Sequence, residues 1–81
     1  MPYILPQIRR DLRYRYPENP GELNYLITKL CTDYIKTTTH LPGYAIYNEI
    51  IGVLECAKQE FYRRVVAPYE DVKRGENGDV Y

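Results

Sequence analysis

The sequence has no Trp and no Ser, and it has one His, one Phe and two Cys among its 81 residues. Without Ser, a Ser–His–Asp catalytic triad is excluded. One His and two widely separated Cys do not give the ligand spacing of a transition-metal site. The sequence also lacks a Walker loop and a Gly-rich dinucleotide fingerprint. We therefore predict no metal, no cofactor and no enzymatic activity.

Long apolar runs are absent as well, because none approaches the roughly 18 residues that a membrane span needs. The opening residues lack the ordered charged, apolar and small-residue regions of a signal peptide. Cys31 and Cys56 lie among apolar residues of helical spacing, where a free cysteine acts as a small hydrophobe. We expect a cytoplasmic protein with reduced thiols that does not associate with a membrane.

What the chain does contain fits one small globular domain over residues 1–81. Of its residues, 44% are apolar and 27% are charged, and the net charge is zero. A domain of this size buries only about 60% of its unfolded surface, so a partner chain often supplies the missing stability. Ten of the eleven aromatic residues are Tyr, and Arg outnumbers Lys seven to four. Both preferences suit interfaces more than a dry core.

Charge is distributed unevenly along the chain. Residues 1–16 carry four Arg against one Asp, residues 17–62 carry a net charge of three negative, and residues 63–81 are balanced. This pattern predicts that the basic N-terminal arm docks on an acidic helix, its own or a neighbour's, or binds an anion. A pI near 6.6 and main helices that are acidic or balanced disfavour a groove-reading nucleic-acid protein. Only the arm at residues 9–15 could touch phosphates.

The first segment, residues 1–19, is predicted to be an arm and a connection. A short helix is expected after Pro6, because proline suits the first helical position and because Ile8 and Leu12 lie four positions apart. Pro17 drives the residue before it toward an extended conformation, so this helix cannot continue into the next segment.

A main helix is predicted over residues 20–39. Asn19 can cap it, Pro20 suits its first position, and Glu22 stands at capping-box spacing. Residues 40–43 (HLPG) end it. Its apolar stripe consists of Leu23, Leu26, Ile27, Leu30, Cys31, Tyr34 and Ile35.

A second main helix is predicted over residues 44–67, where Pro68 breaks it. Gly52 lies in its middle, which a close approach by another helix would explain. Residues 68–81 are predicted to form an ordered tail with a turn signal at Asn77-Gly78. The apolar stripe of the helix consists of Ile46, Ile50, Val53, Leu54, Ala57, Phe61 and Val65, widened by Tyr47, Ile51 and Tyr62.

These elements predict an all-α fold of two main antiparallel helices, with a short N-terminal helix or arm and an ordered C-terminal tail. The apolar arc of the second helix is broader than one shorter helix can cover. We therefore predict a homo-oligomer packed through this helix. The predicted interface residues are Tyr47, Ile51, Gly52, Leu54 and Phe61.

The stretch EFYRRVVAPYED, residues 60–71, places a cation on an apolar face. On a helical wheel Arg64 falls on the same meridian as Ile46, and a guanidinium there must be paired or must reach an anion. In the structural reading, Arg64 extends along the edge of the core and pairs with Glu60, its intrahelical partner, or with a neighbour's carboxylate. In the functional reading, an anion or nucleotide pocket forms at a subunit junction. The residues of that pocket are Arg64, Arg63, Tyr62, Tyr69, Arg9 and Arg10.

The opening MPYI, the helix start GELNYL and the run NEIIGVLECAKQEFYRRVVAPYEDVKRGENGDVY cover most of the chain. This sequence resembles a family of small uncharacterised proteins of phages, prophages and bacterial genomes with the signature IGxLE…KxEFYRRV…PYED…ENGDVY. The Thr-rich connector and the RYRYP segment depart from the family pattern. The resemblance implies a phage-type accessory protein and no mechanism. The matching positions are Asn24, Tyr25, Gly52, Leu54, Glu55, Lys58, Glu60, Phe61, Tyr62, Arg63, Arg64, Pro68, Tyr69, Glu70, Asp71 and the tail from Glu76 to Tyr81.

We expect a non-enzymatic protein that acts by binding, as a homo-oligomer that binds a host protein through a Tyr- and Arg-rich surface. One alternative is a sponge that sequesters a nucleotide signalling molecule at a subunit interface. Another is a structural assembly module without a ligand.

Overall fold

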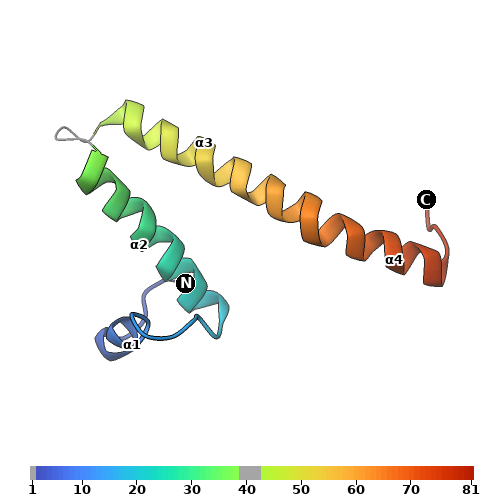
Figure 1. The fold of residues 1–81 in the computed structure, drawn as a ribbon, viewed down its shortest axis with the longest axis horizontal. Coiled ribbons are helices and arrows are strands. Elements are labelled where there is room, and N and C mark those ends of the chain that lie inside the picture. Colours follow the sequence, from blue (N-terminus) through green and yellow to red (C-terminus); the bar gives the residue numbers. More distant parts are fainter. Residues whose placement is uncertain (1, 39–42) are drawn as a thin grey trace. The chain divides into compact units, whose positions relative to one another are not determined.

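The computed structural model describes residues 2–38 and 43–81, and every regular element in them is a helix. The all-α prediction is confirmed. The chain divides into an N-terminal unit, Met1–Pro42, and a C-terminal unit, Gly43–Tyr81. A single domain with antiparallel main helices stays a prediction. The elements in chain order are α1 (Pro6–Asp11), α2 (Pro20–Thr38), α3 (Tyr44–Phe61), the π-helical segment η1 (Tyr62–Val66) and α4 (Ala67–Asn77) (Figure 1).

Helix α1 forms where the sequence predicts a short helix after Pro6. The residue before it, Leu5, is extended with a ψ of 149°, and its carbonyl accepts a bond of 3.1 Å from the backbone N–H of Arg9. At the other end, the Leu12 N–H donates to the Ile8 carbonyl at 3.0 Å. The Leu12 side chain is 6% exposed and is the buried hydrophobic residue of the described chain. It anchors the arm within the N-terminal unit, because burying a leucine contributes about 2 kcal/mol.

Helix α2 begins with the cap that the sequence indicates. Its first residue is Pro20, and the Glu22 N–H donates to the Asn19 side-chain oxygen at 2.9 Å. The Leu23 N–H donates to the Asn19 carbonyl at 3.0 Å. The first bond satisfies one of the backbone N–H groups that a helix start leaves unpaired, and the second is the first regular hydrogen bond of the helix. The helix runs through Thr38, and the stop signals predicted at residues 40–42 lie outside the described residues.

The C-terminal unit differs from the sequence prediction at Pro68. Instead of ending there and giving way to a tail over residues 68–81, the helix continues through η1 and α4 to Asn77 (Figure 1). In η1 the hydrogen bonds span five residues, and the Ala67 N–H donates to the Tyr62 carbonyl. The predicted break assumed an α-helical register up to the proline.

The π-helical turn explains why Pro68 does not stop the helix. In a regular α-helix a proline removes one backbone bond, and its ring clashes with the carbonyl four residues earlier. A turn that takes in an extra residue shifts the register of the carbonyls just before the proline. Pro68 then stands within the first two positions of α4, where a missing N–H costs no bond.

Helix α4 ends at a glycine in a conformation that other residues rarely adopt. Gly78 has a φ of 83°, and its N–H donates to the Arg74 carbonyl at 2.8 Å. The Asn77-Gly78 signal therefore marks a helix C-terminus and not a tight turn of a hairpin. Three residues earlier, Gly75 lies inside the helix, and a Cβ added there would meet nothing within 4 Å.

The two glycines predict opposite effects of the same substitution. Gly75→Ala should stabilise the last turns of α4 by about 1 kcal/mol, because alanine is the better helix former and has room. Gly78→Ala should destabilise them by about 1 to 3 kcal/mol, because alanine is strained at a positive φ. Amide hydrogen exchange of residues 70–77 measures both effects, as slower exchange in the first variant and faster exchange in the second. Equal rates in the two variants would contradict this account of the helix end.

Candidate functional site

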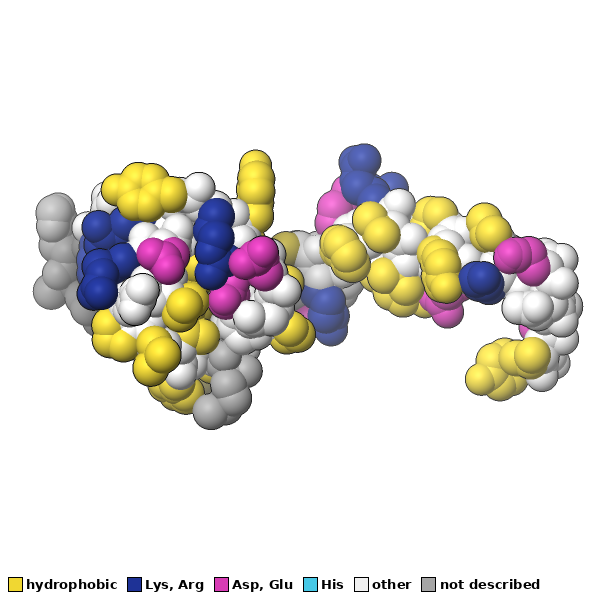
Figure 2. Space-filling model, turned by 90° about the horizontal axis from the view of Figure 1, so that it is seen from below, with side chains coloured by type: hydrophobic (Ala, Val, Ile, Leu, Met, Phe, Trp, Pro, Cys, Tyr) yellow, Lys and Arg dark blue, Asp and Glu magenta, His cyan; other side chains and the backbone are white. Residues whose placement is uncertain are grey.

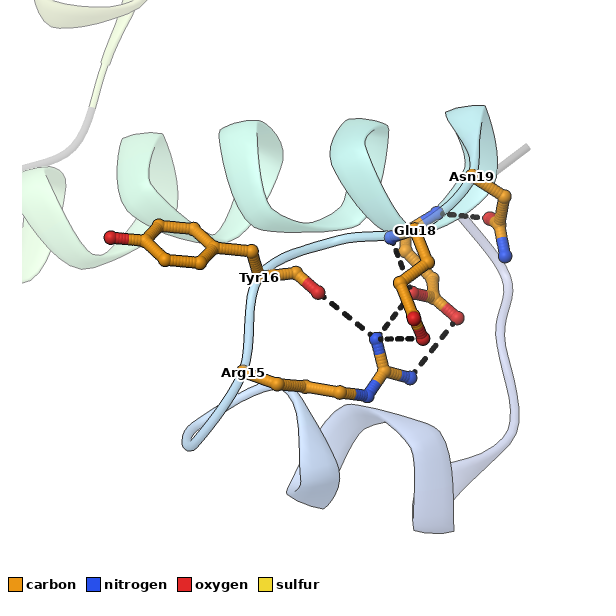
Figure 3. Close-up of polar contacts among 5 residues, drawn as sticks. Arg15, Tyr16, Glu18 and Asn19 are labelled. Carbon is orange, nitrogen blue, oxygen red and sulfur yellow. Dashed lines mark hydrogen bonds and ion pairs between the residues drawn. The ribbon is translucent and has the colours of Figure 1, made fainter.

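The most closely packed polar cluster of the described chain joins the N-terminal arm to the start of α2 (Figure 3). The Arg15 guanidinium donates two bonds to the Glu22 carboxylate, at 2.8 and 3.3 Å, and a third bond of 3.1 Å to the Tyr16 carbonyl. The Glu18 carboxylate lies 3.1 Å from the same guanidinium, and the Glu18 backbone N–H donates to Glu22 at 3.0 Å. We call these contacts around Arg15 and Glu22 the arm clamp.

Glu22 is the buried charged residue of the described chain, with 6% of its surface exposed. The hydrogen bonds from Arg15, followed by the bond from the Glu18 N–H, lower the pKa of Glu22 to about 2, although desolvation acts in the opposite direction. Glu22 raises the pKa of Arg15 in return, mainly through the same hydrogen bonds. A carboxylate that stays ionised at neutral pH and has its oxygens occupied is poorly suited to general acid catalysis. The arm clamp therefore holds structure together.

The arm clamp is one contact of the kind that the charge pattern predicts between the basic arm and an acidic helix. The basic arm does contact the acidic start of its own helix, as the sequence indicated, and it does so through Arg15. Its other three Arg, at positions 9, 10 and 13, make no ion pair in the described part of the chain.

The predicted site residues Arg63 and Arg64 both contact Glu60. The distances are 2.7 Å from Arg63 Nη2 and 2.5 Å from Arg64 Nε to the same carboxylate oxygen. The two guanidinium groups, Arg63 first, lower the pKa of Glu60. Each arginine side chain is 69% exposed. The structure thus has the Arg64–Glu60 pair of the structural reading, while the Arg64 side chain is largely exposed and does not lie at the edge of a core.

Tyr62 and Tyr69 do line one open groove, together with Lys73, Arg74 and the last residues of the chain. The Tyr62 hydroxyl donates to a Glu70 carboxylate oxygen at 2.5 Å, and this bond raises the pKa of Tyr62. The Lys73 ammonium lies 5.7 Å from the centre of the Tyr69 ring. The full lining is Tyr62, Ala67, Tyr69, Glu70, Asp71, Lys73, Arg74, Asn77, Gly78, Asp79, Val80 and Tyr81.

The charges of this groove do not favour a phosphate group. Three carboxylates, at positions 70, 71 and 79, accompany two cations. Both cations already have intrahelical partners, Lys73 at 3.5 Å from Glu76 and Arg74 at 3.9 Å from Asp71. Neither Arg63 nor Arg64 lines this groove, and Arg9 and Arg10 belong to the other unit. Nucleotide binding by the predicted set of residues stays a prediction.

Sequence reasoning missed two features of this chain. The Arg15–Glu22 pair was not predicted, because it depends on how the chain turns at residues 17–19; the excess of Arg in the arm was the available signal. The exposed Tyr14 and Tyr16 were also not selected, although they alternate with Arg in the sequence.

Within the described ranges, no group of three or more His, Cys, Asp or Glu could hold a metal ion. In the same ranges, no helix combines the length and the apolar character that a membrane span requires.

Comparison with known proteins identifies a family. A family model described as "Domain of unknown function (DUF6899)" matches residues 1–80. Neither the curated proteins nor the solved structures contain a match.

The arm clamp predicts an acid-sensitive N-terminal unit. Because folding lowers the pKa of Glu22 from its ordinary 4.5 to about 2, its stabilisation is complete above pH 4.5 and is lost as the pH falls toward 2. Glu22→Gln should therefore lower the melting temperature at neutral pH, and the gap to the wild type should close between those two pH values. Circular dichroism melts across this range measure it. Glu49→Gln, which removes an exposed carboxylate, is the matched control; an unchanged Glu22 gap near pH 2 would contradict the prediction.

Proposed function

The chain belongs to the DUF6899 family of unknown function, and from that premise we propose that it is a non-enzymatic protein that acts by binding. In this proposal it is a phage-type accessory protein that forms a homo-oligomer through its long helix and binds a host protein with its exposed Tyr and Arg side chains. The observation that carries the proposal is the apolar face of α3.

Helix α3 has no buried residue. Its apolar side chains span an arc of roughly 160° at about 100° per residue, and several of them are largely exposed, among them Ile51 at 65% and Phe61 at 61%. Figure 2 shows hydrophobic side chains along the helix of the C-terminal unit. We call the set of apolar residues on this arc the α3 strip; it consists of Ile46, Tyr47, Ile50, Ile51, Val53, Leu54, Ala57 and Phe61.

The charges beside the α3 strip favour a second copy of the chain as its occupant. Lys58 lies 2.9 Å from Glu55, and Glu60 is neutralised by the two arginines that follow it. Apart from the exposed Glu49, these neighbouring charges are paired, so the strip offers little to a strongly charged partner, whereas a symmetric dimer needs a self-complementary surface. In the proposed assembly, α2 and α3 pack antiparallel, and the part of the arc that α2 cannot cover binds the same part of another copy.

Gly52 is the member of the predicted interface that does not fit this assembly. By the same angular count it lies across the helix from Leu54, on the polar side with Asn48. A Cβ added at Gly52 would meet nothing within 4 Å in the chain. The proposed interface therefore retains Tyr47, Ile51, Leu54 and Phe61.

The host-protein part of the proposal is supported by the kind of side chains that remain exposed. Tyr47, Tyr62 and Tyr69 are between 48% and 61% exposed. Tyrosine and arginine are the residues that most often contribute large binding energies at protein interfaces.

The homo-oligomer is tested by placing a charge in the α3 strip. Ile51→Asp should raise the dissociation constant of the oligomer about 100-fold or more, because a symmetric interface loses two buried isoleucines and gains two carboxylates. Asn48→Asp adds the same charge on the polar side of α3 and should leave assembly intact. Native mass spectrometry and sedimentation velocity at micromolar concentration measure the mass. A wild-type monomer, or equal effects of the two variants, would contradict the proposal.

The nucleotide alternative has its own test, because it assigns the anion to Arg64. Arg64→Ala should abolish binding of a nucleotide that copurifies with the protein and should leave the oligomer intact. Native mass spectrometry reports both properties in one measurement. If the variant loses the oligomer instead, or if the wild type carries no nucleotide, Arg64 acts through its ion pair with Glu60 alone.

A further inference from the structure

The cations of the described chain fall into two classes. Eight of the eleven Lys and Arg side chains lie within 4.0 Å of a carboxylate, from Arg15 in the arm to Arg74 in α4. The remaining three, Arg9, Arg10 and Arg13, are exposed and have no ion pair within the described residues. They stand within five consecutive positions, where repulsion between like charges favours an external anion.

The backbone holds these three arginines in a defined arrangement. Arg9 and Arg10 form the last turn of α1. The turn continues because the Arg13 N–H donates to the Arg10 carbonyl at 3.2 Å. Arg13 follows the end of α1 by two residues, so the three arginines belong to one short segment. The buried Leu12 on one side and the arm clamp on the other fix this segment to the N-terminal unit.

Two aromatic rings flank the clamped residue directly after the three arginines. Tyr14 is 88% exposed and Tyr16 is 90% exposed. Burial does not explain rings placed so far into the solvent, and Arg15 between them is held by Glu22. Figure 2 shows Lys and Arg side chains beside protruding hydrophobic ones on the N-terminal unit. We call Arg9, Arg10, Arg13, Tyr14 and Tyr16 the arm patch.

We propose that the arm patch binds single-stranded nucleic acid. The three arginines contact consecutive backbone phosphates, and the two tyrosine rings stack on unpaired bases. Arginine pairs with phosphate through two parallel hydrogen bonds, and stacking on exposed aromatic rings binds single strands with little sequence preference. This inference is independent of the proposed oligomer, which uses α3.

The composition of the arm patch favours a nucleic acid over an acidic protein surface. Between residues 7 and 16 the exposed side chains are polar, charged or aromatic, while of the two aliphatic side chains Leu12 is buried and Ile8 is partly buried. A protein interface needs an apolar centre surrounded by polar residues, and here the exposed apolar groups are two tyrosine rings separated by Arg15, which Glu22 holds. A duplex is disfavoured because its bases are stacked and not available to Tyr14 and Tyr16, and because α1 has only six residues to place in a groove.

The test is fluorescence anisotropy with labelled oligo(dT) and oligo(U) of about 12 nucleotides, measured over a range of salt concentrations with the full chain. A variant combining Arg9→Ala, Arg10→Ala and Arg13→Ala removes the cations of the arm patch. A matched variant combining Lys29→Ala, Lys58→Ala and Arg74→Ala removes the same charge from sites that are paired within helices. Circular dichroism verifies that both variants retain their helical content.

If the proposal is correct, the wild type binds either oligomer with a slope of log K against log salt of about −2, since three phosphates are contacted. The arm-patch variant should lose at least ten-fold in affinity and most of that slope, and the matched variant should lose neither. Tyr14→Ala and Tyr16→Ala should each weaken binding about five-fold or more without changing the slope.

Three results would overturn the proposal. Equal losses in the two triple variants would mean attraction by net charge alone. Equal affinity for a duplex of the same length would remove the role of stacking. Binding of polyglutamate that the arm-patch variant loses, without binding of either oligonucleotide, would identify an acidic protein surface as the partner.

Discussion

The ion pair between Arg15 and Glu22 is the interaction on which the N-terminal unit depends. Helix α1 has six residues, and a helix of this length is not stable alone in water. The pair connects a residue of the arm to the third position of α2, so it closes the connection at residues 16–21. The same carboxylate accepts the Glu18 N–H, while Asn19 caps the Glu22 N–H. One glutamate thereby fixes the helix start, the turn and the arm together.

The C-terminal unit depends on a different constraint, which is that its helix continues past Pro68. A proline inside a long helix normally ends or kinks it, yet here the π-helical turn at Tyr62–Val66 accommodates Pro68 and the helix runs on. A continuous helix exposes more apolar surface, because it presents apolar residues along its whole length and has no core of its own. A helix of this kind owes its stability to what packs on it. This is why we propose a binding role for this helix.

The helices, and the cap at Asn19, could be predicted because they depend on local spacing and local hydrogen bonds. The short helix after Pro6 was predicted for the same reason. The continuation of the helix past Pro68 could not be predicted, since it depends on a change of hydrogen-bond register that no residue type in the sequence indicates. That change also affects Arg64. The helical wheel placed it on the apolar face by assuming a constant rotation per residue. A π-helical turn rotates less per residue, and the side chain lies 69% exposed beside Glu60.

The cations of the described chain differ in whether they form an ion pair with a carboxylate. Each cation of α2, α3, η1 and α4 lies within 4.0 Å of a carboxylate three or four positions away, and Asp33 and Glu60 each contact two cations. Such pairs contribute little to stability, but they weaken the attraction of those helices for anions. The arm has a single Asp among its first sixteen residues, so it cannot do the same. The cations of the described chain that have no ion pair are Arg9, Arg10 and Arg13, which share the arm with Asp11 and precede two exposed tyrosines.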